Sequence, residues 1–443
     1  MEFREAVDRD VQDLQDLAGS IAASTGDSRV MADLKAHLPV GRNDFFAQER
    51  ALESAAWTLR RSWLALAHRP ADALPKSPRA GQTAHLACGD DLSFGYDRDL
   101  DPSILEARGS DYMNRPAEQA CDLVLYRSGQ AALSGLLQLA ISRWGGQGAL
   151  TVAHAGAYFE TAAWLDRWPD RIFRRCGATE AEADLVIAEP VWCDGGFGRP
   201  THLPRPRRAL LLDTTMVGPA YDAGWHLHGS CPLVAAYSSG LKLDQAGLEL
   251  ANVGIVRLFG HDPAELRDIA SGLREIRSLT ASGLTFDEAS ALSAPWFMDR
   301  RYTDRYTAAI FAHNRALAAA IGTRSAVFAA RCHPSLEHPD TQAPFCALTL
   351  KEPTAANYRR LTEIVRRGSN RRGLHLVQGG SFGFRSHRFE LIEPAPGQGE
   401  MFLRVAMGWR DGHSRQGLCD LFAELAAAPS FAALDRRQSR QGR

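Results

Sequence analysis

The sequence predicts an α/β protein with a mostly parallel sheet between helices, followed by a smaller α+β domain. From about residue 122, short apolar runs alternate with helix-like segments. These runs lack the polar alternation of a half-exposed strand, which favours strands covered on both faces. After about residue 295 the order changes to one long helical segment followed by short strands and helices. With 443 residues and 45% hydrophobic content, the chain can bury a large core in more than one structural unit.

The expected elements follow one another regularly. In the sheet, the strands are DLVLYRSG, ALTVAH, DLVIAEP, RALLLDTT, PLVAAYSSG and ANVGIVRLFG, with QAALSGLLQLAISRW and AYFETAAWLDRW as helices after the first two. In the second domain, the strands are CALTLKE, LHLVQGG and MFLRVAMG, and the helices are DRYTAAIFAHNRALAAAI, ANYRRLTEIVRRG and a last one around GLCDLFAELAAA.

The first ninety or so residues are expected to be helical. The stretch NDFFAQERALESAAWTLRRSWLALAH spaces its apolar residues at three and four, with Asn43 or Asp44 as the N-cap. We therefore divide the chain into an N-terminal helical extension or arm (1–93), an α/β domain (94–295) and a C-terminal α+β domain (296–443).

Composition excludes several classes of function. The formal net charge is −1 with mixed signs, which argues against a nucleic-acid surface and a polybasic membrane anchor. The charged start and the lack of an apolar run of about 18 residues predict a cytoplasmic protein. The eight cysteines include no C-x-x-C pair and no Cys/His cluster, so we expect neither a metal site nor a disulfide framework.

Three places in the α/β domain carry chemistry. Ser128, Gly129 and Gln130 lie where a strand ends and a helix begins, which favours an anion site, although such turns are common. Asp213 ends a buried strand, where open α/β sheets bind ligands, and its alternative role is a cap or turn residue.

Lys242 is the third place. The chain has 51 lysines and arginines, but only four of them are lysines. A lysine near a buried strand is suited to Schiff-base chemistry, which arginine cannot perform. The alternative is a solvated loop lysine. Together, an anion site, a strand-end carboxylate and this lysine would hold pyridoxal 5′-phosphate by its phosphate, ring nitrogen and aldehyde.

The order of these motifs is similar to the Cys/Met-metabolism family of pyridoxal-phosphate enzymes, the cystathionine γ-synthase, γ-lyase and β-lyase group, from about residue 94 to 412. The resemblance implies the fold type I architecture. SGQAA resembles the phosphate cup S-G-M-A-A, DTTMVGP resembles D-N-T-F-x-x-P, and SSGLK resembles H-S-x-T-K. The resemblance therefore implies that Asp213 lies at the pyridinium nitrogen with Thr215 beside it. It also implies that Ser239 binds the phosphate and that Lys242 is the Schiff-base lysine.

Further segments extend the resemblance. AYFETAAWL resembles the Y-G-G-T/S segment, which implies that Tyr158 stacks on the cofactor ring and takes part in proton transfer. YDRDLDPSILE resembles Y-x-R-x-x-N-P-T, which implies that Tyr96 and Arg98 reach the cofactor phosphate of a neighbouring subunit. The expected protein is thus a homo-oligomer, a dimer or tetramer, with shared active sites.

The C-terminal domain supplies the expected substrate site. GGSFGFRSH resembles S-L-G-G-x-E-S and LRVAMG resembles L-R-L-S-V-G, which implies that Arg404 holds the substrate α-carboxylate with Ser381 close by. A guanidinium in an apolar strand needs an anionic partner in any case. A structural salt bridge is therefore the alternative for Arg404.

The sequence also departs from the family pattern. Leu241 replaces the threonine before the lysine, and Phe159-Glu160 replaces the Gly-Gly after the tyrosine. The asparagine expected beside the phenolic oxygen falls on Cys193, or on Asp194 with a gap.

The predicted activity is elimination or replacement at the side chain of an amino-acid substrate, with the γ carbon favoured, through aldimine and quinonoid intermediates. The departures favour a specialised substrate. The alternatives are another pyridoxal-phosphate reaction, namely β-elimination, aldol chemistry or transamination, and a non-catalytic binding protein with the same fold.

Overall fold

The computed structural model describes most of the chain. The described residues are 3–39, 44–69, 75–79, 82–92, 94–113, 119–176, 180–193, 197–198, 203–227, 231–329, 332–394 and 399–434. Within these ranges, no helix is long and apolar enough to span a membrane.

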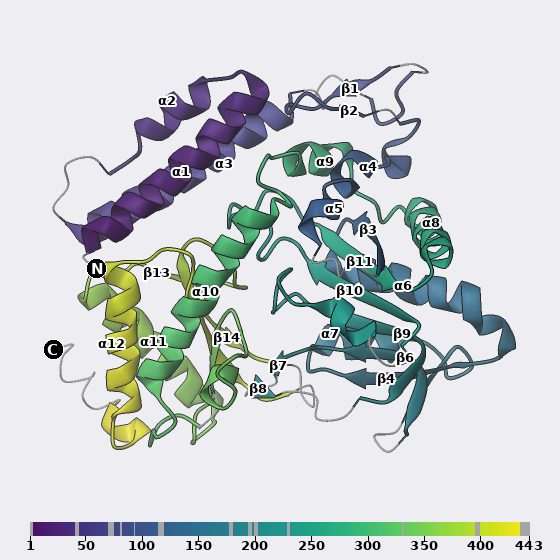
Figure 1. Cartoon of the computed structure of the whole chain (residues 1–443). Coiled ribbons are helices and arrows are strands. Elements are labelled where there is room, and N and C mark those ends of the chain that lie inside the picture. The colour runs from purple at the N-terminus through teal and green to yellow at the C-terminus, as the bar shows by residue number, and fades with distance from the viewer. Residues whose placement is uncertain are drawn as a thin grey trace.

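A seven-stranded sheet forms the centre of the α/β part (Figure 1). Its order is β3-β11-β10-β9-β6-β4-β5, and only β11 runs antiparallel to its neighbours. The other strands therefore present their carboxyl ends at one edge. The strands are β3 (Ala120–Tyr126), β4 (Leu150–Ala155), β5 (Phe173–Arg175), β6 (Glu182–Ala188), β9 (Arg205–Asp213), β10 (Leu233–Ser239) and β11 (Gly254–Gly260).

Both faces of this sheet are covered, as the apolar runs predict. In β3, Val124 and Tyr126 belong to a core shared with α6 (Gly129–Trp144) and α8 (Pro263–Leu279). Leu123 and Leu125 alternate with them and join a second core on the opposite face. This second core includes α9 (Phe286–Leu292) and the N-terminal helices.

The N-terminal helices pack onto the body of the protein. They are α1 (Phe3–Thr25), α2 (Arg29–Lys35) and α3 (Phe45–Ala67), and Asp44 caps α3 by accepting from the N–H of Phe46 at 3.0 Å. The predicted helix and one of its two predicted caps are confirmed, and Asn43 lies outside the described residues. The indole N–H of Trp63 donates to the carbonyl of Ala291 at 2.8 Å, so α3 is joined to α9.

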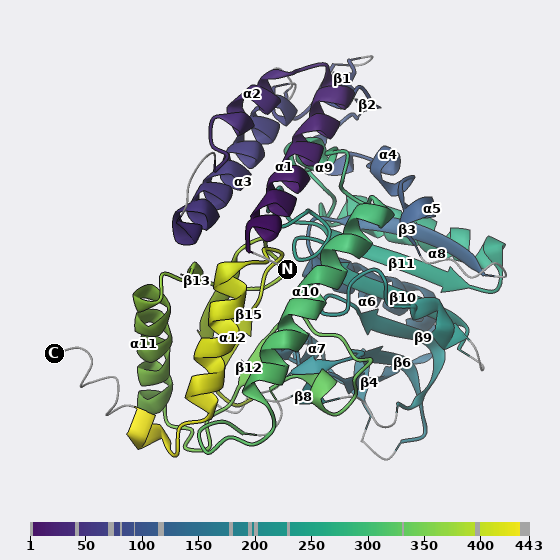
Figure 2. The ribbon, with the colours of Figure 1, turned by 60° about the vertical axis from the view of Figure 1, so that its left-hand side comes forward.

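The C-terminal part contains a four-stranded sheet of order β12-β15-β14-β13. Helix α10 (Arg300–Ile321) lies against α12 (His413–Ala426), between the two sheets (Figure 2). The remaining elements are α11 (Ala355–Arg371), β12 (Cys346–Leu348), β13 (Leu376–Gln378), β14 (His387–Ile392) and β15 (Phe402–Ala406).

Short elements connect these parts. They are β1 (Ala84–His85), β2 (Asp91–Leu92), α4 (Ser103–Glu106), α5 (Gly109–Tyr112), α7 (Phe159–Leu165), β7 (Trp192–Cys193), β8 (Phe197–Gly198) and 3₁₀ turns at Asp97–Asp99, Gly145–Gln147, Ala223–Leu227 and Pro334–Leu336.

Candidate active site

A cavity of about 450 Å³ opens at the carboxyl edge of the central sheet. The ends of β3, β4, β6, β9 and β10 supply one side of it, and the C-terminal sheet supplies the other. Except for Tyr96 and Arg98, the residues predicted for the site all line this cavity: Ser128, Gly129, Gln130, Tyr158, Asp213, Thr215, Ser239, Lys242, Ser381 and Arg404. The fold therefore brings together groups that are far apart in the sequence.

The start of α6 forms one wall of the cavity. Ser128 is the N-cap, and its hydroxyl accepts from the N–H of Ala131 at 3.1 Å. A helix leaves the N–H groups of its first turn without partners inside the helix, and Gly129 and Gln130 occupy that turn. A Cβ on Gly129 would lie 3.3 Å from the backbone nitrogen of Ser239. Gly129 is therefore packed closely against Ser239 at the end of β10.

Asp213 lies at the end of β9. Thr215 donates its N–H to Asp213 Oδ1 at 2.9 Å, and its hydroxyl accepts from the N–H of Ser239 at 3.0 Å. Burial raises the pKa of Asp213, and the hydroxyl and N–H of Thr215 lower it in part. Burial thus disfavours the charged form of Asp213, and a cationic group bound beside it would stabilise that form.

Lys242 lies in the turn after β10 and faces the cavity. Its Nζ donates to the hydroxyl of Ser381, and it lies 5.8 Å from the centre of the Phe382 ring. Burial lowers the pKa of Lys242, and the positive charge of Arg404 lowers it further. A solvated loop lysine, the alternative interpretation, does not fit these surroundings.

Tyr158 is held by two carboxylates. Its N–H donates to Glu189 Oε1 at 2.8 Å, and its hydroxyl donates to Glu160 Oε2 at 2.7 Å. Burial raises the pKa of the Tyr158 phenol, and the hydrogen bond and charge of Glu160 raise it further. The phenol therefore keeps its proton at neutral pH. Glu189 was not among the residues predicted for the site, although its position directly after the apolar run of DLVIAEP was a signal.

Arg404 forms an ion pair with a partner that was not identified from the sequence. Glu390 on β14 is the cross-strand partner of Arg404 on β15, and the two side chains are paired. The Arg404 guanidinium carbon lies 5.3 Å and 5.8 Å from the ring centres of Phe345 and Phe382. Burial lowers the pKa of Arg404 to about 10. The salt bridge left open as an alternative is present, on a residue that also lines the cavity.

Glu390 also contacts a second predicted residue. Its Oε1 accepts from the N–H of Ser381 at 3.2 Å. One carboxylate thus holds both Arg404 and Ser381. In the sequence, Glu390 alternates with apolar residues in HRFELI, but nothing in that pattern indicates its partners.

Tyr96 and Arg98 lie outside the cavity. Tyr96 is 56% exposed. The guanidinium carbon of Arg98 lies 5.3 Å from the centre of the Tyr96 ring. Their role in the site of a neighbouring subunit stays a prediction.

Two of the departing residues line the cavity. Phe159 and Cys193 lie on the wall of the cavity. Glu160 does not line the cavity, but it accepts a hydrogen bond from the hydroxyl of Tyr158, which does. Asp194, the alternative to Cys193, lies outside the described residues. Apolar side chains cover much of the remaining surface, including Val191, Met216, Ile392 and Phe402.

Comparisons with known proteins place the fold. No protein-family model matches the sequence, and no curated protein matches it. Among solved structures, apo CalE6, a methionine gamma lyase from Micromonospora echinospora, has a TM-score of 0.50 and 17% identity over 82% of this chain and 98% of that one. The structure of metB from Corynebacterium glutamicum has a TM-score of 0.53 and 13% identity over 75% of this chain and 88% of that one. The predicted fold class, fold type I, is confirmed.

Proposed function

We propose that this protein is a pyridoxal-phosphate enzyme that eliminates or replaces a group on the side chain of an amino acid. The observation that carries the proposal is that Lys242, Asp213 and the start of α6 line one cavity. The shared fold with a methionine gamma lyase supports it. The γ carbon is the favoured position, and the substrate is a specialised amino acid with a γ leaving group.

The residues of the cavity fit the cofactor. Gly129, Gln130 and Ser239 offer N–H and hydroxyl donors for a phosphate at a helix start. Asp213 offers a carboxylate for a protonated ring nitrogen, and Lys242 offers an amine for an aldehyde.

Bound pyridoxal 5′-phosphate supplies an electron sink next to the substrate Cα. Asp213 would hold the protonated ring nitrogen, since a carboxylate beside that nitrogen stabilises its protonated form. Lys242 takes a proton from Cα with its Nζ, and its lowered pKa increases the share of neutral amine available for this.

Tyr158 supplies a proton rather than removing one. Its phenol pKa is raised by burial and by Glu160, so the hydroxyl is protonated when the substrate binds. Its hydroxyl hydrogen bond to Glu160 at 2.7 Å orients the phenol in the cavity. This arrangement suits protonation of a leaving group.

Arg404 and Ser381 bind the substrate carboxylate in this proposal. A guanidinium can hold a carboxylate by two parallel hydrogen bonds. Phe345, Phe382 and Phe402 line this end of the cavity, and the rings of Phe345 and Phe382 lie beside the Arg404 guanidinium.

Turnover of defined amino acids tests the proposal. Purified protein loaded with pyridoxal 5′-phosphate is incubated with O-acylhomoserine, cystathionine, methionine or cysteine, and keto acid, ammonia and thioether are measured. We expect products from a γ-substituted substrate and none with Lys242→Ala. Products from cysteine alone would indicate β-elimination. Cofactor binding without turnover of any γ-substituted amino acid would count against the proposed reaction.

A further inference from the structure

The loop between β13 and β14 places Ser381 and Phe382 against Lys242. Ser381 has a φ of +69°, in the left-handed region that residues other than glycine rarely adopt. Gly383 follows with a φ of +83°, and a Cβ there would lie 2.2 Å from the carbonyl oxygen of Lys242. The loop is therefore closely packed in a conformation that its surroundings must maintain.

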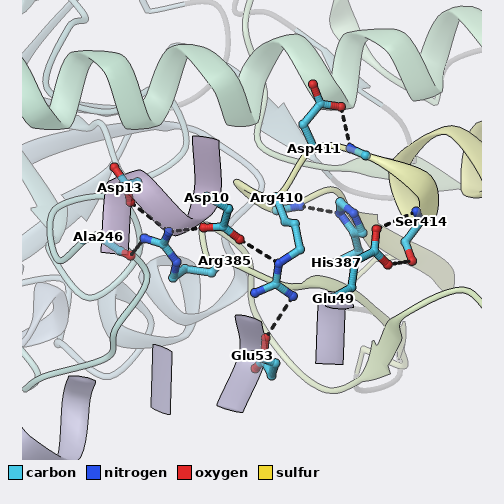
Figure 3. Close-up of polar contacts among 12 residues, drawn as sticks. Asp10, Asp13, Glu49, Glu53, Ala246, Arg385, His387, Arg410, Asp411 and Ser414 are labelled. Carbon is cyan, nitrogen blue, oxygen red and sulfur yellow. Dashed lines mark hydrogen bonds and ion pairs between the residues drawn. The ribbon is translucent and has the colours of Figure 1, made fainter. Parts of the chain in front are cut away.

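Arg385 holds the far end of this loop. Its side chain is buried, and its Nη2 donates to Asp10 and, at 2.8 Å, to Asp13 (Figure 3). Both acids are on α1. Its Nη1 also donates to the carbonyl of Ala246 at 3.4 Å, in the segment that follows Lys242. One guanidinium thus joins α1, the loop and the segment that bears the lysine.

Asp10 has a second cationic partner. Arg410 Nε donates to Asp10 Oδ2 at 2.9 Å, and Arg410 Nη1 donates to Glu53 of α3 at 3.3 Å (Figure 3). The N–H of Arg410 also donates to the carbonyl of Arg385 at 3.1 Å. Asp10 is 3% exposed and Arg410 is 2% exposed. Removing the charge of Asp10 would leave buried cations incompletely compensated, which is strongly unfavourable.

We propose that Asp10 and Asp13 are positioning residues of the candidate site: through Arg385, helix α1 fixes the loop that sets Ser381 and Phe382 against Lys242. The N-terminal helices then complete the site in addition to covering the core. This inference goes beyond the proposed function, because it concerns the surroundings of Lys242 in the chain before any cofactor or substrate binds.

Glu49 provides a matched control. It is a buried acid of α3 that accepts from the N–H of Ser414 at 2.9 Å and from its hydroxyl. These bonds also join the N-terminal helices to the C-terminal part, at the start of α12. Among the hydrogen bonds of the described residues, none joins Glu49 to the loop. Glu49→Gln and Asp10→Asn both replace a buried carboxyl group by an amide. Glu49 bonds to Ser414 at the start of α12, whereas Asp10 bonds to Arg385 and Arg410.

The titration of Lys242 is the first readout, measured in the chain without cofactor. The four lysines are reductively methylated with ¹³C, and their NMR signals are followed with pH, with Lys242→Arg providing the assignment. In the wild type we expect Lys242 to titrate below the ordinary value of a lysine, because burial lowers its pKa and Arg404 lowers it further. We expect Asp10→Asn to raise that midpoint by about one pH unit as the loop moves away. Glu49→Gln should leave it unchanged.

Hydrogen exchange of the loop is the second readout. Peptides covering 379–389 should exchange about tenfold faster in Asp10→Asn and in Asp13→Asn, because local opening costs less when Arg385 loses a partner. Glu49→Gln should lower the urea midpoint of unfolding without changing exchange in the loop. If both aspartate variants lose stability but keep wild-type loop exchange and the wild-type Lys242 midpoint, α1 is only an anchor and the proposal is wrong.

Two further measurements cover the case in which Asp10→Asn does not fold. Asp13→Asn retains the pair between Asp10 and Arg410, and the same two readouts decide the proposal for that variant. The second measurement is hydrogen exchange of the wild-type protein at increasing urea concentrations, which requires no substitution. The loop and α1 should open together, and opening of α1 while the loop stays protected would overturn the proposal.

Discussion

Glu390 and Arg404 face each other across β14 and β15, and their charged groups form an ion pair at the wall of the cavity. In the proposed function, a substrate carboxylate that approaches Arg404 would therefore meet a guanidinium that is already partly occupied. Arg404 Nε is buried and has no hydrogen-bond partner among the described residues. Because a guanidinium carries five N–H donors, Arg404 can hold Glu390 and a second carboxylate together.

Glu390→Gln tests whether the negative charge of Glu390 weakens the binding of a substrate carboxylate beside it at Arg404. Glutamine keeps an acceptor for the N–H of Ser381 but removes the charge opposite Arg404. We expect the KM of a productive amino acid to fall about tenfold with little change in kcat, since charge-assisted bonds contribute about 1.5 to 3 kcal/mol. Glu393→Gln, which changes an acid paired with Arg359, is the control. A KM that rises instead would mean that Glu390 mainly positions Arg404.

The Tyr158 phenol should ionise more easily without Glu160. Glu160 accepts from the phenol at 2.7 Å, and after burial it is the next cause of the raised pKa. Removing its charge in Glu160→Gln lowers the pKa, because ionised phenol no longer lies beside a carboxylate. The change is measured as tyrosinate absorption during a pH titration, with Tyr158→Phe as the reference. An unchanged titration would show that Glu160 does not control this proton.

Gly254→Ala tests the packing beneath the start of α6. A Cβ on Gly254 would lie 2.1 Å from the carbonyl oxygen of Ser128, which is backbone and cannot move freely. We expect a loss of about 1 to 3 kcal/mol in the free energy of unfolding, together with weaker cofactor binding. Gly260→Ala is the control at the other end of the same strand, where a Cβ would lie 3.2 Å from the end of the Leu266 side chain. Equal effects of both substitutions on cofactor binding would contradict this explanation.

Asp10 should contribute to the loss of stability in acid. Burial raises its pKa, but the charges of Arg385 and Arg410 outweigh this, so the pKa lies below the ordinary value of 3.8. A carboxyl group with a lowered pKa stabilises the fold above its ordinary pKa, and this contribution is lost as the pH falls through the folded-state pKa. The free energy of unfolding of Asp10→Asn should therefore fall less steeply below pH 3.8 than that of the wild type. Urea unfolding at several pH values measures this, and identical slopes would contradict it.

Sequence alone predicted the fold and the groups that follow strands. Asp213, Ser128 and Lys242 come at or within a few residues of the ends of apolar runs, and parallel strands bring their carboxyl ends to one edge. Chain order was therefore enough to place them together.

Other contacts could not be predicted, because they depend on distant segments. Asp10 and Arg385 are separated by 375 positions, and neither lies in a pattern that indicates the other. Glu390 meets Arg404 only because of the register of β14 with β15. In a strand with alternating polar and apolar residues, or in an amphipathic helix, the sequence pattern around a buried acid is the same as that around a solvated acid.

Cofactor absorption tests the central claim most directly. When the chain is mixed with pyridoxal 5′-phosphate and dialysed, a Schiff base on Lys242 predicts a retained band at about 420 nm. The band should be absent from Lys242→Ala, and borohydride reduction should leave the pyridoxyl group on Lys242 alone among the four lysines. A wild-type chain that retains no band, or a band of equal strength in Lys242→Ala, would contradict the account.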